Sequence, residues 1–520
     1  WKPHAWSAWK ARTRRHAPPS LPTEASPPAS TFAAPREGGH RSPRAEATMK
    51  LTCLSTTGGG GSYHSPASHL LELEGLRFLL DCPIDLTALA DFSPVPLTGD
   101  AGGLIRAVPR YLSPAAAAAA KVGGIDAVLV SSATGMLGLP FLARLPGFAH
   151  TKIYVTEVAA RTGKLMMGEL VEMHREFVSP GNIEECMQKI QPVKYGEEVC
   201  FNGIFTLKAS SSGLELGNSV WTIKGPRASI TYLPSSVFVS AHALDFDYSS
   251  LKENDVILFS DLSSLNDMDV DNDKLDEHAM DETEHSLCRR SVLRDDGADV
   301  DEKIAFLCNN DDIKEEIERI SYICSCIIDA IKSGGSVLIP IGRLGVILLL
   351  LELISEMLHS SSIKVPIFMV SETAEEIIAF TNALPEWLCK SRQEKLFSGE
   401  ALFDHVDLLK EGKLFLFPHL HSKDLIAAWK EPCIVLCPHW SLRLGPAVHL
   451  LRRWHADKRC LLVLEQGSDA ELCLKPFMPL AIQVLECSFL SGLRTEKIDT
   501  LLGVLKPKFV MVCSLFPQIK

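Results

Sequence analysis

The residues with the clearest chemical meaning lie in a short loop that follows a buried segment. The apolar run Ala127–Val130 predicts a strand, and after it come Ser131, Ser132, Thr134 and Gly135. A buried strand that ends in small polar residues and glycine typically carries a loop to the edge of a sheet. A hydrolase that uses two metal ions needs imidazoles and carboxylates at such strand ends, because they hold the metals that polarise a phosphate and activate water. This loop supplies hydroxyl groups but no imidazole and no carboxylate.

One carboxylate does follow a predicted strand elsewhere. Asp81 ends the segment FLLD, which is apolar up to that point. It could bind a metal, but a carboxylate at a strand end also accepts hydrogen bonds from backbone N–H groups, and we favour this second interpretation. His242, near Asp245 and Asp247, is interpreted as a loop residue because no other histidine accompanies it.

Other histidines give weaker signals. His419 and His421 are two residues apart and therefore share one face of a strand. Asp424 is the one acidic residue close to them in the sequence, and no cluster of carboxylates accompanies them. We therefore interpret the two histidines as a surface or turn pair. His439 precedes Trp440, and packing against that ring is favoured over contact with a substrate.

Five basic residues lie close together in the sequence between residues 443 and 459. They are Arg443, Arg452, Arg453, Lys458 and Arg459. A phosphate-contacting surface for RNA, with Arg443, Arg452 and Arg453 as its contacts, is one interpretation. A solvated helix face, with Leu450, Leu451 and Trp454 pointing inward, is the interpretation that we favour.

Composition limits the function further. The chain has 520 residues, of which 46% are hydrophobic and 22% charged, and this is ordinary for a globular protein of two or three domains. The formal net charge of −12 argues against nonspecific binding of nucleic acid by the whole surface, although a local basic channel is compatible with it. The fifteen cysteines show no paired CxxC spacing, which favours a reducing compartment such as the nucleus or cytosol. No apolar run reaches the length of a transmembrane helix.

The elements that must position these residues alternate between strand and helix from Met49 onward, which predicts an α/β fold. Predicted helices are Arg161–Val178, Asp312–Lys332, Leu344–Leu358, Ala374–Leu384 and Thr495–Leu505. Predicted strands in the second half are Ser336–Pro340, Val365–Ser371, Cys460–Glu465, Ile482–Cys487 and Phe509–Cys513.

Two segments have compositions that do not suit a packed core. Residues 1–48 are rich in Pro, Ala, Ser and Arg, so we interpret them as a disordered upstream extension outside the fold and leave open whether they are translated. Residues 266–312 are acidic and poor in aromatic side chains, which predicts a solvated linker or insertion. A calcium loop is disfavoured there, because the segment lacks the glycine and the terminal glutamate of an EF-hand.

Several segments resemble the metallo-β-lactamase/β-CASP family of RNA- and DNA-processing nucleases. They are MKLTCLS from Met49, FLLDCPIDLT from Phe78, SGGSVLIPIGRLGVILLLLELI from Ser333 and EPCIVLCPHWSLRLGPAVHLLRRW from Glu431. The resemblance covers essentially all of residues 49–516. It implies a metallo-β-lactamase αββα sandwich with an inserted β-CASP α/β domain.

The resemblance also implies domain boundaries. The first part of the metallo-β-lactamase-like domain is expected at 49–265, the acidic linker at 266–312 and the β-CASP-like domain at 313–457. The chain is then expected to return to the first domain at 458–520. In the family a partner-binding region follows, and we expect it to be absent from this chain, so that binding through that route is weak.

When the family's metal-binding positions are mapped onto this chain, few of them hold a residue that can bind a metal. The positions are occupied by Ser131, Ser132, Thr134 and Gly135, by Leu214 and Ser235, and by Leu493 and Cys513. Carboxylates remain at two positions, Asp81 and Asp261. Two carboxylates cannot hold a catalytic metal pair, so we expect a pseudoenzyme with no catalytic residues, no metal and no other cofactor.

For function, the resemblance implies a non-catalytic scaffold that pairs with an active β-CASP endonuclease subunit in the nucleus. The complex of that pair processes the 3′ ends of small nuclear RNAs and attenuates transcripts at RNA polymerase II. The chain would then meet RNA indirectly and would not contact a membrane. The alternative is an active metal-dependent β-CASP RNA endonuclease, which the missing histidines disfavour. A third class, an enzyme with a different site on the same fold, has no feature in its favour.

Overall fold

The computed structural model describes most of the chain from Met49 to Val512. The described residues are 49–54, 66–85, 87–96, a few positions between 113 and 121, 124–174, 178–252, 254–260, 300–309, 311–465, 470–489, 492–493 and 495–512. The extension at 1–48 and most of the acidic segment at 266–312 lie outside the described residues.

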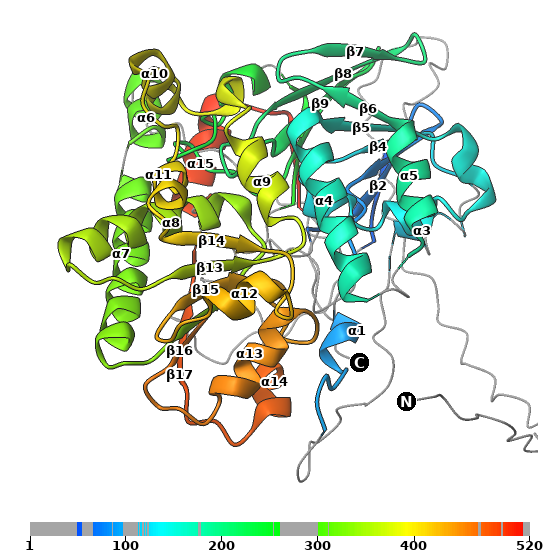
Figure 1. The fold of residues 1–520 in the computed structure, drawn as a ribbon. Helices are drawn as coiled ribbons and strands as arrows, with labels where there is room; N and C mark the ends of the chain where they lie inside the picture. The colour runs from blue at the N-terminus through cyan, green and yellow to red at the C-terminus, as the bar shows by residue number, and fades with distance from the viewer. Residues whose placement is uncertain are drawn as a thin grey trace, which may run out of the picture.

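Two six-stranded sheets pack face to face (Figure 1). The first sheet has the order β1-β2-β3-β4-β5-β6, with strands Lys50–Cys53, His69–Leu73, Leu76–Leu80, Ala127–Leu129, Lys152–Thr156 and Ile190–Val193. The second has the order β18-β11-β10-β9-β8-β7, with strands Phe509–Val512, Val256–Phe259, Ser229–Leu233, Ser219–Lys224, Phe205–Ser211 and Glu198–Phe201. Strands β3 and β4 run parallel, as do β10 and β11, so loops from several strands gather at one end of the sandwich.

The core between these sheets is aromatic. Phe78 of β3 contacts the rings of Phe201 and Phe205 edge-on, at centroid distances of 5.5 and 5.3 Å. Trp221 and Tyr232 from the second sheet are fully buried in the same cluster. Aromatic side chains of this size supply much of the apolar area that holds two sheets together.

Helices cover the outer face of each sheet and complete an αββα arrangement. The first sheet is covered by α3 (Leu139–Leu142), α4 (Glu157–Met173) and α5 (Pro180–Lys189). The second is covered by α15 (Thr495–Leu505), against which α6 (Val300–Leu307) packs. A short α1 (Thr87–Ala90) follows β3. We call this unit the sandwich lobe.

The third sheet is parallel throughout and forms a second unit, which we call the inserted lobe (Figure 1). Its order is β14-β13-β15-β12-β16-β17, with strands Leu414–Phe417, Ile367–Val370, Ile434–Cys437, Val337–Pro340, Leu461–Glu465 and Gln483–Cys487. Its helices are α7 (Asp311–Lys332), α8 (Leu344–Ser360), α9 (Ala374–Thr381), α10 (Lys390–Ser398), α11 (His405–Lys410), α12 (Lys423–Ala428), α13 (Pro446–Trp454) and α14 (Ala470–Leu474). Apolar clusters lie on both faces of this sheet, and β12, β13 and β15 are buried along their whole length, as expected of central parallel strands.

The structure differs from the sequence prediction at two boundaries. β16 and β17 extend the third sheet, because β16 pairs with β12, so the chain returns to the sandwich only at α15 and not at residue 458. Within the segment predicted as a linker, Val300–Leu307 forms α6, whose Leu307 is buried. The acidic composition of the whole segment hid the short apolar pattern at its end. Among the described helices, none combines the length and the apolar character that crossing a bilayer requires.

Helix α4 begins where β5 ends, and Thr156 explains why. Its side-chain hydroxyl accepts a hydrogen bond from the Ala159 N–H at 3.3 Å and donates one to the Gly217 carbonyl. The hydroxyl therefore caps the helix and ties it to the β8–β9 loop of the second sheet. The predicted helix started four residues later, at Arg161, because its apolar spacing was considered without this cap.

We predict that Thr156→Ala lowers the free energy of unfolding by about 2 kcal/mol, because it removes a cap and leaves a buried carbonyl without its donor. Urea denaturation followed by circular dichroism measures the change. Thr156→Ser keeps the hydroxyl and serves as the control; an equal loss in both variants would contradict this role for the hydroxyl.

Candidate functional site

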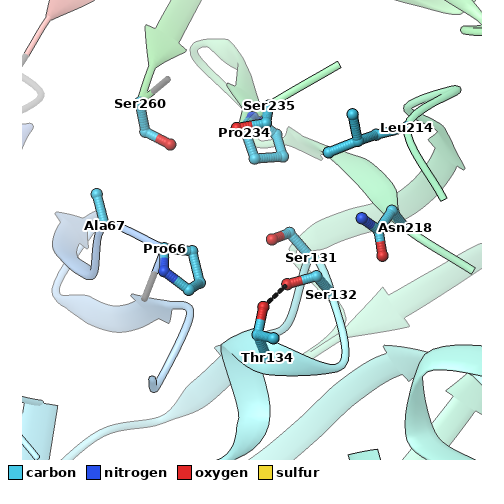
Figure 2. Close-up of a pocket in the computed structure, with 10 residues that line it drawn as sticks. All are labelled: Pro66, Ala67, Ser131, Ser132, Thr134, Leu214, Asn218, Pro234, Ser235 and Ser260. Carbon is cyan, nitrogen blue, oxygen red and sulfur yellow. Dashed lines mark hydrogen bonds between the residues drawn. The ribbon is translucent and has the colours of Figure 1, made fainter. Parts of the chain in front are cut away.

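A small pocket opens at the end of the sandwich where the loops gather (Figure 2). Its volume is about 30 Å³, room for one or two water molecules. The lining residues are Pro66, Ala67, Ser131, Ser132, Thr134, Leu214, Asn218, Pro234, Ser235 and Ser260. Most of its polar lining groups are hydroxyls, and Figure 2 shows Ser132 and Thr134 joined by a hydrogen bond of 3.1 Å.

The sheet topology explains why these residues meet. Ser131 and Ser132 follow β4, Ser235 follows β10 and Ser260 follows β11, and each leaves its strand at the carboxyl end. Leu214 comes from the β8–β9 loop. The pocket is therefore bounded by both sheets of the sandwich.

Asp81 lies against this pocket and is fully buried. One carboxylate oxygen accepts the Ser131 N–H at 2.7 Å, and the other accepts the hydroxyls of Ser131 at 2.6 Å and Tyr232 at 2.7 Å. Ser131 belongs to the first sheet and Tyr232 to the second, so the carboxylate joins the two sheets. Asp81 thus has the strand-end role that the sequence favoured, with the addition of Tyr232.

The charge on Asp81 is held in a dry environment. Burial raises the pKa of this carboxyl group, while the hydrogen bonds from Ser131 and Tyr232 and the nearby His69 oppose the rise. The backbone is also unusual, because Asp81 has a φ of 58°. A non-glycine residue in the left-handed region needs compensating contacts, and these hydrogen bonds supply them.

The Asp81 carboxylate fits here because Gly135 has no side chain. A Cβ at this position would lie 2.2 Å from Asp81 Oδ1 and 2.9 Å from its Cγ. Any side chain at residue 135 would therefore displace the carboxylate from its donors. The Gly135 amide also donates to the Ser132 hydroxyl at 3.1 Å.

The structure brings together most of the residues that the resemblance assigned to metal-binding positions, but not all of them. Ser131, Ser132, Thr134, Leu214 and Ser235 line the pocket, and Gly135 touches Asp81. Leu493 is instead buried in the apolar cluster that packs on the outer face of the second sheet. The remaining two, Asp261 and Cys513, lie outside the described residues.

The residues of the pocket do not fit a two-metal centre. Zinc is bound by imidazole, thiolate or carboxylate, and the pocket lining supplies none of these. The adjacent carboxylate of Asp81 already accepts three hydrogen bonds. In the part of the chain that the structure describes, no three His, Cys, Asp or Glu side chains converge in a way that could hold a metal ion.

The three arginines proposed as RNA contacts differ in exposure. Arg443 is 1% exposed and donates to the carbonyls of Ala90, Leu472 and Cys473, so its guanidinium faces the interior. Arg452 and Arg453 are exposed on α13, and Arg453 pairs with Glu431 at 2.8 Å.

The other histidines lie away from this pocket. His439 packs beside Trp440, as predicted, and its Nδ1 lies 2.7 Å from the Ser441 hydroxyl. His419 and His421 stack on each other at a ring distance of 4.9 Å.

His242 is not a simple loop residue. It is 6% exposed, and its Nε2 lies 3.2 Å from Glu352 of α8, which also accepts two hydrogen bonds from Arg392 of α10. Burial acts to raise the pKa of Glu352, but the hydrogen bonds and charges of His242 and Arg392 outweigh it and lower the pKa to about 2. The group joins the loop after β10 to the inserted lobe. Sequence reasoning missed it, because its members are 40 and 110 residues apart.

A second buried ion cluster also crosses between the lobes. Arg343, just before α8, pairs with Glu465 at the end of β16 and with Glu215 of the β8–β9 loop, the latter at 3.5 Å. All three residues are less than 10% exposed. Breaking a buried pair by removing one partner is strongly destabilising, so this cluster fixes the position of one lobe against the other.

The family comparison agrees with the architecture of the inserted lobe, because residues 344–471 match the family model described as the Beta-Casp domain. The fold is thus metallo-β-lactamase-like with an inserted β-CASP domain. Among solved structures, a protein of unknown function from Enterococcus faecalis V583 aligns with 89% of this chain and 93% of its own, at a TM-score of 0.43 and 12% identity.

Among curated proteins, the chain is 26% identical to the Integrator complex subunit 9 homolog of Nematostella vectensis, over 89% of this chain and 72% of that protein. It is 24% identical to Integrator complex subunit 9 of Homo sapiens, over 90% and 72%. The chain is also 24% identical to cleavage and polyadenylation specificity factor subunit 2 of Oryza sativa, over 76% of this chain and 45% of that protein. The chain is therefore a β-CASP family member and a homologue of Integrator complex subunit 9.

We predict that Asp81→Ala lowers the free energy of unfolding by about 3 kcal/mol, because three buried donors lose their acceptor. Asp81→Asn should cost less, since its carbonyl can accept the Ser131 N–H while the two hydroxyls rotate to accept from the amide. Urea denaturation measures both variants. The exposed Asp407→Asn is the control, and an Asp81→Ala variant as stable as the parent would contradict a structural role.

We also predict that Gly135→Ala is destabilising by about 2 kcal/mol, since the added methyl collides with the Asp81 carboxylate. Gly168→Ala is the matched control, because nothing lies within 4 Å of a Cβ at that helical position and alanine favours helix. Thermal unfolding should lower the melting temperature of the first variant only. Equal melting temperatures for the two variants would contradict the steric argument.

Proposed function

We propose that this protein is a non-catalytic scaffold subunit of an Integrator-type complex in the nucleus. In this proposal it pairs with the catalytic β-CASP endonuclease subunit and supports processing of small nuclear RNA 3′ ends. The observation that carries the proposal is the pocket at the strand ends, where hydroxyl and apolar side chains stand in place of metal ligands.

The way Asp81 is used supports the same proposal. In a metal site a carboxylate must keep its lone pairs available for the cation. Here the donors Ser131 and Tyr232 occupy both oxygens of Asp81. The residue has become part of the sandwich core, so its retention does not require metal chemistry.

The contacts between the lobes support a scaffold role in physical terms. The Arg343 cluster is buried, the His242–Glu352–Arg392 group is largely buried, and the two cross between the lobes at separate places. Two main-chain hydrogen bonds also connect the lobes: the Cys389 N–H donates to the His242 carbonyl, and the Leu244 N–H donates to the Trp387 carbonyl. A rigid pair of lobes presents a constant outer surface, and fold and surface can persist when chemistry is lost.

Direct RNA contact has a smaller place in the proposal. Arg452 and Arg453 are exposed on α13, where Arg453 is paired with Glu431, whereas Arg443 supports the fold. In the proposed assembly, RNA binding and cleavage depend mainly on the catalytic partner.

The proposal predicts the metal content of the purified chain. We expect well below one zinc ion per chain by inductively coupled plasma mass spectrometry, and no cleavage of a small nuclear RNA precursor. A histidine-complete β-CASP nuclease, purified in the same way, is the control for metal loss. About two zinc ions per chain, with RNA cleavage that Asp81→Asn abolishes, would overturn the proposal in favour of an active endonuclease.

The assembly gives a second test. Ser132→Ala combined with Ser235→Ala changes the pocket without touching the lobe contacts described above. We expect this variant to copurify with the catalytic β-CASP subunit and to leave cleavage by the reconstituted complex unchanged. A loss of cleavage at unchanged recovery of the partner would assign chemistry to this pocket and contradict the proposal.

A further inference from the structure

The inserted lobe has a basic edge on the side that faces away from the sandwich lobe. All six strands of its sheet are parallel, so their amino ends lie at one edge and their carboxyl ends at the other. The carboxyl ends meet the sandwich lobe. Arg343, which follows β12, pairs with Glu215, and Ser371, which follows β13, donates a hydrogen bond to Glu169 of α4. The amino ends of the strands therefore form the opposite, outer edge of the lobe.

A lysine lies in the connection before each of five neighbouring strands at this outer edge. Across the sheet, in the order β14, β13, β15, β12 and β16, these residues are Lys413, Lys364, Lys430, Lys332 and Lys458. We call them the lysine row. Main-chain hydrogen bonds hold the connections side by side; the Ile367 N–H, for example, donates to the Lys413 carbonyl at 2.8 Å. Because neighbouring strands are about 4.8 Å apart, the row extends over about 19 Å.

Most of the positive charge at this edge is not neutralised by ion pairs. Salt bridges join Lys413 to Glu411 at 2.6 Å, Arg453 to Glu431 at 2.8 Å and Arg459 to Asp457 at 2.7 Å. Among the residues that the structure describes, five further cations at this edge are exposed and form no salt bridge: Lys332, Lys364, Lys430, Arg452 and Lys458.

The next acidic residues on the same elements do not cancel this excess. Asp329 and Glu356 are exposed one turn further back, on α7 and α8. Five cations therefore face two acids at the outer edge of the lobe. The edge is positive in a chain whose formal net charge is −12.

Helix dipoles explain only part of this pattern. Lys332 lies in the last turn of α7, and Arg452 and Arg453 lie in the last turn of α13, where a cation offsets the negative end of the helix dipole. That effect falls off within the last turn, whereas Lys364 and Lys458 lie beyond their helices, in the connections that lead to β13 and β16. The row as a whole requires another explanation.

The chemistry of the edge suits a polyanion better than a folded protein partner. Protein interfaces depend on buried apolar and aromatic anchors. Of the large, exposed apolar side chains in the described part of the chain, none lies in the five connections, which are residues 332–336, 361–366, 411–413, 429–433 and 455–460. A nucleic acid backbone carries a negative charge on every nucleotide, so a line of cations is enough to bind it.

We propose that the lysine row, together with Arg452, binds the phosphodiester backbone of single-stranded RNA. The surface recognises charge and not sequence, because the aromatic side chain at this edge, Trp429, is already stacked on Phe368 and Trp454, with ring centroids 5.2 and 6.1 Å away. The choice of RNA as the polyanion rests on the proposed function. An acidic protein segment is the competing occupant, and the experiment below separates the two.

The number of cations sets the expected strength of binding. Contacts with four or five phosphates of a single strand give a slope of about −3 for the logarithm of the binding constant against the logarithm of the salt concentration. Binding of this nonspecific kind is expected with a dissociation constant in the micromolar range at about 50 mM salt.

Fluorescence anisotropy of a labelled oligouridine, titrated with the full chain between about 50 and 200 mM salt, tests the proposal. The variant combines Lys364→Glu, Lys430→Glu and Lys458→Glu. We expect it to bind about tenfold more weakly or worse, with a salt slope that is shallower by about 2 because three phosphate contacts are lost.

The matched control combines Lys152→Glu, Lys194→Glu and Lys252→Glu, three exposed residues of the sandwich lobe. It changes the net charge by the same amount and should keep the salt slope and most of the affinity of the parent. All six positions are exposed, so both variants should keep the melting temperature of the parent.

Three results would overturn the proposal. They are no binding of oligouridine by the parent at about 50 mM salt, an equal loss of affinity in the two triple variants, and tighter binding of a polyglutamate peptide than of an oligouridine of equal charge. The last result would assign the row to an acidic protein segment. The assay uses the chain alone, so its failure is distinct from a failure of the zinc and copurification tests of the proposed function.

Discussion

The fold of this protein depends on one buried carboxylate that is shared by two sheets. Asp81 leaves the first sheet in a left-handed backbone conformation and accepts hydrogen bonds from Ser131 of that sheet and Tyr232 of the opposite one. Dispersion and aromatic packing hold the sheets together, but they are not directional, whereas these bonds fix how the ends of the sheets meet. The arrangement of every loop around the pocket follows from that fixed point.

The same principle operates where the lobes meet. Buried ionic groups are poor sources of net stability, but they are intolerant of displacement, so they specify one relative placement. Arg343 with its two glutamates and Glu352 with its partners His242 and Arg392 impose this placement at separate points of the boundary. Glu169 adds a third polar contact, in which its carboxylate accepts a hydrogen bond from Ser371 of the inserted lobe.

Much of this could be predicted from the chain itself. The apolar periodicity located α8 from Leu344 and α15 at Thr495–Leu505. The family resemblance assigned Asp81, Ser131 and Ser235 to one site, and the structure places them at the same end of the sandwich. The sequence could not predict Tyr232 as the partner of Asp81, because an alternating strand pattern says that a tyrosine is buried but not what its hydroxyl meets. Leu493 was expected at the pocket and lies elsewhere, since its position was carried over from the family resemblance, which does not show how this part of the chain packs on the second sheet. The contacts between the lobes could not be predicted for a related reason. Each joins residues that lie far apart along the chain, and no periodic pattern in the sequence relates such residues.

The fit between Gly135 and Asp81 has a consequence for how this chain can change by mutation. A mutation that introduced a ligating side chain at residue 135 would expel the Asp81 carboxylate and weaken the sandwich before any metal could bind. A mutation that freed Asp81 first would lose hydrogen bonds and gain no ligand. Both of these steps toward a metal site therefore pass through a less stable protein. Stability alone opposes them, with no need for selection against catalysis.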